Sequence, residues 1–388
     1  MQGTSITIVC RFDSFTRIGL AIADLFLHEC SDVFFYVIDP QYSPKNLVKE
    51  VKCRCTNSKF HLRFGFPSNI PSPLIFLSLT GAFIKRFVAL FATELASEKR
   101  PLLITSFPGL SYQNVYDGLA SRSLCDLILF NNLYEYRRYL EFVKKYGLKD
   151  CGFIAGFFSN FDSNLSRGCH CKDFIFSEQV AAPNTKLERK YLARKLIDFS
   201  MSIQEHGNLY VKPRLSDGGK AIFQTKLNFV EALNASSTSI PRNLILTNNS
   251  VFEYIQQGAS SLTVSSTVGI ETLEFHNRSY FIQDFGPSEQ VGSDYFASSG
   301  SYLFLDELIE GRRCEVNKVW AREHYQLFSH DAFFNVIYKL ISSGERNGLH
   351  NARKLFSMSL LKTYSSNTVR KISWFRGFLF AISNKFLS

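Results

Sequence analysis

The 388-residue chain is predicted to be an α/β protein with two doubly wound parallel domains facing a cleft and a helical C-terminal tail. Apolar, β-branched runs alternate with amphipathic helical stretches in both halves, which is the pattern of βαβ units. A polar segment of loop-forming residues, 159–172, separates the halves. The length suits roughly two domains. We therefore expect domains at 1–165 and 166–345, followed by a tail at 346–388.

The first half begins with a short buried strand, because β-branched residues crowd the run SITIVC at 5–10. Helical periodicity follows at 18–29, and DVFFYVID at 32–39 returns to a strand. The alternation then continues with strands expected at 100–106, 125–132 and 151–157 and helices at 112–123 and 133–147. The apolar run 73–84 is expected to be a core strand or helix, because it is shorter than the roughly 20 residues that span a bilayer.

The second half repeats this architecture without repeating the sequence. Its expected strands lie at 173–180, 208–215, 243–248, 260–265 and 278–282. Its expected helices lie at 184–207, 226–236, 250–258 and 267–277. Because parallel strands share one direction, the loops that follow them meet at one edge of the sheet, where ligands gather.

Composition indicates a folded protein with an unevenly placed charge. Hydrophobic residues make up 45% and charged residues 20% of the chain, which leaves no sign of disorder. The net charge is +10, and the segment from Arg346 to Ser388 holds eight basic and no acidic residues. Aromatic residues alternate with these cations near the end, as in segments that lie on anionic membranes. The alternative is a final helix that packs back on the first domain.

The nine cysteines do not form a regular disulfide framework. Two C-x-C pairs, at 53–55 and 169–171, lack the C-x-x-C spacing of zinc sites and have no matching histidine pair. The opening residues lack the charged-then-apolar order of a secretory signal. We expect reduced thiols in a cytoplasm and no metal.

The segment SSTVGIETLEF carries the strongest candidate site. Ser265, Ser266 and Thr267 would occupy a strand-to-helix turn, where hydroxyls, backbone amides and the helix dipole favour a phosphate, and Gly269 would allow close approach. Simple N-capping by a hydroxyl is the alternative.

A second cluster of candidates follows the strand expected at 208–215. Lys212 and Arg214 flank Pro213, which fixes the turn, and the polar loop 216–220 comes next. Cations held in this way suit a nucleotide phosphate or a carboxylate. A solvated surface loop is the alternative.

The first domain supplies candidates for the acceptor side of a reaction. Asp13, Ser14 and Arg17 directly follow the first strand, and Pro108 and Gly109 lie in a loop after a later strand. Asp13 is a candidate general base for an acceptor hydroxyl. A helix-capping role for this aspartate is the alternative.

Two familiar nucleotide motifs do not occur. The chain has neither a D-x-D pair for a metal-bridged nucleotide nor a G-x-x-x-x-G-K-[ST] phosphate loop. The basic residues match no nucleic-acid recognition motif. We therefore expect no metal, no cofactor and no nucleic acid.

The stretches DFIFSEQVAAPNTKLERKYLARKL, YVKPRL, NLILTNNSVFEYIQQGASSLTVSSTVGIETLEF and DFGPSEQVGSDYFASSG together resemble bacterial GT-B glycosyltransferases of capsule and lipopolysaccharide assembly, some of which use CMP-activated Kdo or sialic-type sugars. DSFTRIGLA near the start is similar to the same group. The resemblance implies two Rossmann-like domains, with the acceptor in the first and a nucleotide-sugar donor in the second. Its donor residues would be Lys212, Arg214, Ser265, Ser266, Thr267, Gly269 and Glu271.

One departure concerns the chemistry. Many such transferases have His-Pro where this chain has Lys212-Pro213, so a histidine acid on the leaving phosphate does not carry over. Lys212 would instead neutralise that phosphate. The expected function is a metal-independent transfer of a sugar, from a CMP-linked nonulosonic acid or Kdo, to a surface glycan at the inner membrane. A nucleotide-sugar epimerase and a non-catalytic glycan- or membrane-binding protein are the alternatives.

Overall fold

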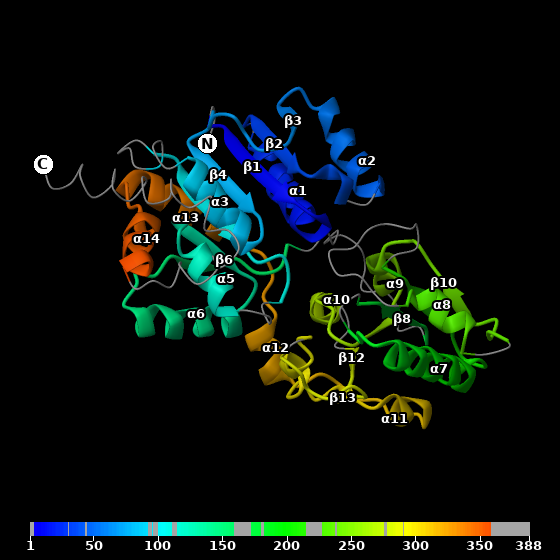
Figure 1. The fold of residues 1–388 in the computed structure, drawn as a ribbon. Helices are drawn as coiled ribbons and strands as arrows, with labels where there is room; N and C mark the ends of the chain where they lie inside the picture. Colours follow the sequence, from blue (N-terminus) through cyan, green and yellow to red (C-terminus); the bar gives the residue numbers. More distant parts are fainter. Residues whose placement is uncertain are drawn as a thin grey trace, which may run out of the picture. The chain divides into compact units, whose positions relative to one another are not determined.

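The structure is a computed structural model. It describes residues 4–29, 31–42, 45–91, 95, 100–110, 115–158, 172–179, 182–214, 227–236, 239–274, 278–289 and 291–357. The chain forms two compact units, of which the first comprises 1–108, 114–158 and 328–388 and the second 109–113 and 159–327. Each has its own parallel sheet (Figure 1). The predicted linker, apart from Lys172, lies outside the described residues.

The sheet of the first unit has seven strands, all parallel, in the order β3-β2-β1-β4-β5-β6-β7. They are β1 Ile6–Arg11, β2 Val33–Ile38, β3 Phe60–Phe64, β4 Leu74–Ser78, β5 Leu102–Ser106, β6 Leu127–Phe130 and β7 Gly152–Ile154. β4 and β5 are buried throughout, because helices cover both faces of a parallel sheet. The expected strands are confirmed; β3, an edge strand with exposed residues, was not predicted.

Helices pack on both faces of this sheet. They are α1 Asp13–His28, α2 Lys45–Cys53, α3 Gly81–Leu90, α5 Val115–Arg122 and α6 Leu133–Tyr146, with 3-10 turns η1 Pro40–Tyr42 and η2 Arg54–Thr56. Side chains of β1 alternate between the two apolar layers, since Ile8 packs in the layer of Phe26 from α1 and Val9 in the layer of Phe87 from α3. α6 begins where Asn132 accepts a hydrogen bond from the Glu135 amide.

The chain returns to the first unit after residue 327. Helix α13, His330–Ser343, packs on α1, where Phe333 and Phe334 meet Phe26 with ring centroids 6.4 and 5.4 Å apart. Residues 328–345, which the sequence analysis placed in the second domain, therefore belong with the first unit. The periodicity of α13 indicates an apolar face but not the surface that this face covers.

Helix α14, Asn347–Ser357, also packs on the first unit. The Asn351 side chain exchanges hydrogen bonds of 2.8 and 2.9 Å with the backbone of Lys149, and the Gly348 amide donates to Asp126. The last part of the predicted tail, 358–388, lies outside the described residues. Among the helices that are described, none is both long and apolar enough to cross a membrane.

The sheet of the second unit has six parallel strands in the order β10-β9-β8-β11-β12-β13. They are β8 Phe174–Ser177, β9 Leu209–Lys212, β10 Leu244–Leu246, β11 Ser260–Thr263, β12 Ser279–Ile282 and β13 Tyr302–Leu303. The helices are α7 Lys186–Ile203, α8 Phe229–Asn234, α9 Val251–Gln256, α10 Val268–Glu271, α11 Leu305–Ile309 and α12 Lys318–His324, with 3-10 turns η3 Thr272–Glu274 and η4 Asp294–Phe296. The prediction of two doubly wound α/β sheets is confirmed.

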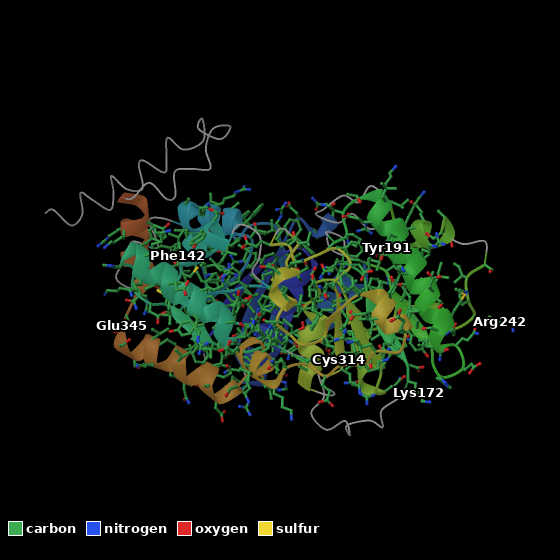
Figure 2. All side chains as sticks on the ribbon, turned by 90° about the horizontal axis from the view of Figure 1, so that it is seen from below. Phe142, Lys172, Tyr191, Arg242, Cys314 and Glu345 are labelled. Carbon is green, nitrogen blue, oxygen red and sulfur yellow. The ribbon has the colours of Figure 1, made fainter. Side chains whose placement is uncertain are left out.

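Local signals fix the beginning of α7. Thr185 and Glu188 form a capping box, in which each side chain accepts a hydrogen bond from the backbone amide of the other. The hydroxyl of Tyr191 on α7, labelled in Figure 2, donates a 2.8 Å hydrogen bond to Asp284 after β12. This bond ties the long helix to the sheet across 93 residues of sequence.

Candidate functional site

The order of strands marks one position on each sheet. In the second unit β8 lies between β9 and β11, so the strands that follow it continue first to one side and then to the other. In the first unit β1 lies in the same way between β2 and β4. Ligands of doubly wound sheets bind outside the carboxyl ends of the two strands that flank this reversal. Those strands are β8 and β11 in the second unit and β1 and β4 in the first.

The hydroxyl-rich turn directly follows β11, as predicted. Ser265 and Ser266 are 2% and 7% exposed, and Thr267 is half-buried. The Ser266 hydroxyl accepts a 3.3 Å hydrogen bond from the Val268 amide, and its own amide donates to the hydroxyl of Thr263. The Ser266 hydroxyl is therefore engaged within the turn, although the N-cap residue of α10 is Thr267, whose side chain makes no capping hydrogen bond.

Most amides of this turn have partners within it. The Gly269 amide donates to the Ser266 carbonyl at 3.1 Å and the Ile270 amide to the Thr267 carbonyl at 2.9 Å. The α-helix that follows has only four residues before it tightens into η3. Several of the backbone amides that were expected to face a phosphate are therefore satisfied within the short turn.

Gly269 has a packing role, which the sequence did not predict. A Cβ on this residue would lie 2.5 Å from Cε1 of Phe281 and 3.2 Å from Cγ2 of Thr263. The glycine therefore lets α10 approach the sheet closely. Close packing of a helix on a strand is a known use of glycine at such turns.

A buried triangle of hydroxyls fixes the same segment. Ser261 of β11 contacts Thr272 of η3 and Ser279 of β12 at 3.1 and 3.0 Å, and Thr272 contacts Ser279 at 2.5 Å. Thr272 also donates to the Gly269 carbonyl. Several hydroxyls of this region therefore hold the fold together, which their sequence pattern alone does not reveal.

Two hydroxyls at the reversal point have no hydrogen-bond partner among the described residues. They belong to Ser265, after β11, and to Ser177, the last residue of β8, which is 6% exposed. The two strand ends are joined, because the Thr263 hydroxyl donates a 3.2 Å hydrogen bond to the Ser177 carbonyl. A buried hydroxyl without a partner is costly, so a ligand that accepted from both would be stabilised. Ser177 was not among the residues predicted from the sequence.

The loop after β8 is held by a buried ion pair. Arg189 of α7, which is 0% exposed, donates a 2.7 Å hydrogen bond to Glu178 and a 3.1 Å bond to the Gln179 carbonyl. The other carboxylate oxygen of Glu178 accepts from the Arg214 amide at 2.8 Å. This pair connects the loops after β8 and β9, and the sequence analysis did not identify it.

The predicted cations after β9 have different environments. The Lys212 ammonium donates hydrogen bonds to the carbonyls of Asn248 and Asn249 in the loop after β10. Lys212 is therefore bound to the loop after β10. The side chain of Arg214 is exposed. The remainder of the predicted loop, 216–220, lies outside the described residues.

Glu271 is the last residue of α10, the short helix that follows the hydroxyl-rich turn. Burial raises the pKa of its carboxyl to about 7, and a hydrogen bond with the Thr267 side chain opposes part of that rise. The side chain of Glu271, the last residue of α10, thus contacts the side chain of Thr267 just before α10. The carboxyl therefore changes charge near neutral pH.

We expect Glu271 to make stability pH-dependent. Its folded pKa of about 7 lies above the ordinary 4.5, so the folded state retains a proton that the unfolded state loses between these values. This contribution is present below pH 4.5 and is lost as the pH rises to 7. Glu271→Gln should therefore melt at a higher temperature than wild type at pH 8 and at the same temperature near pH 4.5. Equal melting curves at both pH values would contradict the assignment.

The acceptor-side candidates lie near the carboxyl edge of the first sheet. α1 begins at Asp13, whose side chain is not among those described, and Phe12 rather than Asp13 occupies the N-cap position. Ser14 is half-buried, and Arg17 is exposed with a guanidinium nitrogen 3.9 Å from a Glu50 oxygen.

The loop after β5 divides between the two units. Pro108 belongs to the first unit and Gly109 to the second, and both are half-buried. A Cβ on Gly109 would lie 3.1 Å from Cγ2 of Thr267, a residue of the same second unit. The glycine therefore belongs with the turn after β11 and not with the acceptor-side residues.

Two doubly wound sheets, each with a candidate site at its strand reversal, define an α/β protein with the two-domain organisation of the GT-B class. The chain belongs to the family described as "Putative glycosyltransferase (DUF6716)", whose sequence profile covers residues 64–337. The protein is thus an enzyme of the glycosyltransferase class. No curated protein sequence matches the chain.

Solved structures with a similar course of the backbone include the following three. Arabidopsis thaliana UGT89C1 complexed with UDP is 9% identical, with 92% of this chain and 99% of that chain covered and a TM-score of 0.49. A putative UDP-N-acetylglucosamine 2-epimerase from Listeria monocytogenes is 11% identical (88% and 96% covered, TM-score 0.49). MurG of Acinetobacter baumannii is 12% identical (87% and 99% covered, TM-score 0.44).

Proposed function

We propose that the protein transfers a sugar from a nucleotide donor, a CMP-linked nonulosonic acid or Kdo, to a surface glycan. Membership of the glycosyltransferase family supports the reaction class. The choice of CMP rests on the sequence resemblance described above. The observation that supports the donor site is the pair of buried hydroxyls without partners, Ser177 and Ser265, at the ends of β8 and β11.

In the proposed reaction the acceptor oxygen forms a bond to the anomeric carbon as the bond from that carbon to the phosphate oxygen breaks. The leaving nucleotide takes the electron pair, and the acceptor proton passes to Asp13, the proposed base. Hydrogen bonds from Ser177 and Ser265 would stabilise the departing phosphate, as would the positive charge of Lys212. Each of these interactions strengthens as negative charge develops on the leaving oxygen.

A panel of CMP, CDP, UDP and GDP tests the nucleotide by thermal shift. We expect CMP to raise the melting temperature most, because a ligand that binds only the folded state stabilises it. Ser177→Ala and Ser265→Ala should each weaken CMP binding roughly two- to tenfold, which is the value of one hydrogen bond, without lowering the melting temperature of the free protein.

Ser301→Ala is the matched control. Its hydroxyl is also buried in the second unit without a partner among the described residues, but it precedes β13 and so lies at the amino edge of the sheet. This variant should bind CMP as wild type does. A CMP affinity unchanged by both strand-end variants, or no nucleotide shift at all, would contradict the donor site. Conversion of a UDP-sugar without any acceptor would indicate an epimerase.

The proposal includes a peripheral location at the cytoplasmic face of the inner membrane. It is supported by the composition of the segment from Arg346 to Ser388, which contains eight basic residues and no acidic residue. The full chain should co-sediment with vesicles that contain anionic lipid, and a chain without 366–388 should not. Equal sedimentation of the two chains would remove the membrane part of the proposal.

A further inference from the structure

Arginine and phenylalanine side chains stack on one another at the strand reversal of the first unit. The guanidinium carbon of Arg11, the last residue of β1, lies 4.0 Å from the ring centroid of Phe83 on α3. That of Arg86, one turn further along α3, lies 5.8 Å from the same ring and 4.6 Å from the ring of Phe66. The rings of Phe66 and Phe83 are themselves stacked, with centroids 5.9 Å and planes 9° apart.

The four residues of this Arg–Phe stack come from three places on the carboxyl edge of the sheet. Arg11 ends β1, Phe66 follows the end of β3, and Phe83 and Arg86 lie in the first two turns of the helix after β4. β1 and β4 are the strands that flank the reversal. The stack therefore lies where a doubly wound sheet binds its ligand.

The charge of the stack is only partly compensated. Arg11 pairs with Asp39 at 2.8 Å. Arg86 is exposed and, within the described residues, has neither a hydrogen bond nor an ion pair, so its contacts are the two rings. A guanidinium that stacks on an aromatic face keeps its N–H edge available and is restricted in its rotamers, which suits it to bind a carboxylate or phosphate.

Further positive charge lies on the same edge. Arg122 is buried and donates hydrogen bonds to the carbonyls of Leu79, just after β4, and of Ser106, the last residue of β5. Burial lowers the pKa of this guanidinium to about 10, so it remains charged at neutral pH. The backbone just before α3 is therefore in contact with a cation. Its positive charge adds to the attraction of this edge of the sheet for an anion.

The backbone at this position is held in a strained conformation. Phe12, between Arg11 and α1, has φ 69° and ψ 172°, a backbone conformation that residues other than glycine rarely adopt. The centroid of the Phe12 ring lies 4.2 Å from the guanidinium carbon of Arg11. Phe12 and Phe83 therefore both pack on this guanidinium. Two rings therefore pack near the Arg11 guanidinium, and one of them belongs to a residue in a costly backbone conformation.

We propose that the Arg–Phe stack binds an anionic group of the acceptor, a carboxylate or a phosphate, and so selects acidic glycans. This inference rests on the proposed function for the identity of the ligand as an acceptor. The ion pair of Arg11 with Asp39 orients one guanidinium, and Arg86 supplies the exposed hydrogen-bond donors. The aromatic rings exclude water from one side of each cation, which strengthens its attraction for the ligand.

The test measures binding by calorimetry on the full chain without a nucleotide. The probes are trigalacturonate, which carries carboxylates, a glycerol phosphate trimer, which carries phosphodiesters, and neutral maltotriose. We expect one acidic probe to bind at least tenfold more tightly than maltotriose, and Arg86→Gln to reduce that binding about tenfold, the value of a charge-assisted bond. The acidic probe that binds identifies the group.

Arg242→Gln is the matched control, because it removes an exposed arginine before β10 in the second unit (Figure 2) and should leave binding unchanged. Phe66→Leu keeps both charges but removes a stacking ring, so it should weaken binding less than Arg86→Gln does. Equal binding of acidic and neutral probes, or equal losses in Arg86→Gln and Arg242→Gln, would overturn the proposal. A CMP thermal shift retained in Arg86→Gln would show that the donor site is intact in either case.

Discussion

Replacing Arg189 by methionine should lower the free energy of unfolding of the second unit by about 3–5 kcal/mol, because it leaves the buried carboxylate of Glu178 without a charged partner. Both side chains of the pair are nearly inaccessible, at 1% and 5%. Urea unfolding followed by tryptophan fluorescence measures this loss. A Trp374→Phe background leaves Trp320, in the second unit, as the single reporter of the two tryptophans.

Two further variants test the cause of the loss. Lys195→Met removes a cation from the same helix, where its partner Asp306 is 60% exposed, and should change stability by less than about 1 kcal/mol. The double variant Glu178→Leu with Arg189→Met should be more stable than Arg189→Met alone, since no buried charge is left unpaired. If the double variant were the less stable of the two, desolvation of Glu178 would not be the cause.

Replacing Gly269 by alanine should destabilise the second unit by about 1–3 kcal/mol through overpacking. The new methyl group would lie 2.5 Å from the ring of Phe281. That ring cannot move easily, because it is 0% exposed and stacks on Phe296 with centroids 4.0 Å apart. The measurement is the melting temperature of the protein without nucleotide.

Gly118→Ala is the control for this prediction. Gly118 lies inside α5, and a Cβ there would have its nearest neighbour at an ordinary 3.4 Å, so alanine should be neutral or stabilising. If Gly269 served only to admit a ligand, Gly269→Ala would melt as wild type does and would lose only nucleotide binding. That result would restore the role that the sequence predicted.

Local sequence patterns predicted the parallel α/β architecture well, because the alternation of β-branched runs with amphipathic helices is a short-range property. The same reasoning located the turn at 265–267. It placed the start of the first helix at residue 18, whereas the helix begins at Asp13. It failed for β3 and for the position of α13. An edge strand with exposed residues has only a weak hydrophobic pattern. The periodicity of an amphipathic helix does not identify the surface on which the helix packs.

The candidate sites depended much more on long-range contacts. Ser177 and the turn that holds Ser265 come to the same edge only because β8 and β11 are adjacent in the sheet, where Ser177 pairs with Thr263. Gly269 was predicted to admit a ligand, but its contacts with Phe281 and Thr263 show that it lets α10 pack on the sheet. Arg11 and Arg86 meet on one ring because β1 and β4 are adjacent strands.

The sequence by itself determined the class of fold, the strand-to-helix turns at the carboxyl edges of two sheets, and the concentration of positive charge after Arg346. Only the tertiary structure decided which hydroxyls of those turns are satisfied and which cations have partners. The physical reason is that periodicity along the chain sets which side of an element is apolar, whereas hydrogen-bond satisfaction depends on atoms that strand pairing brings together from distant residues.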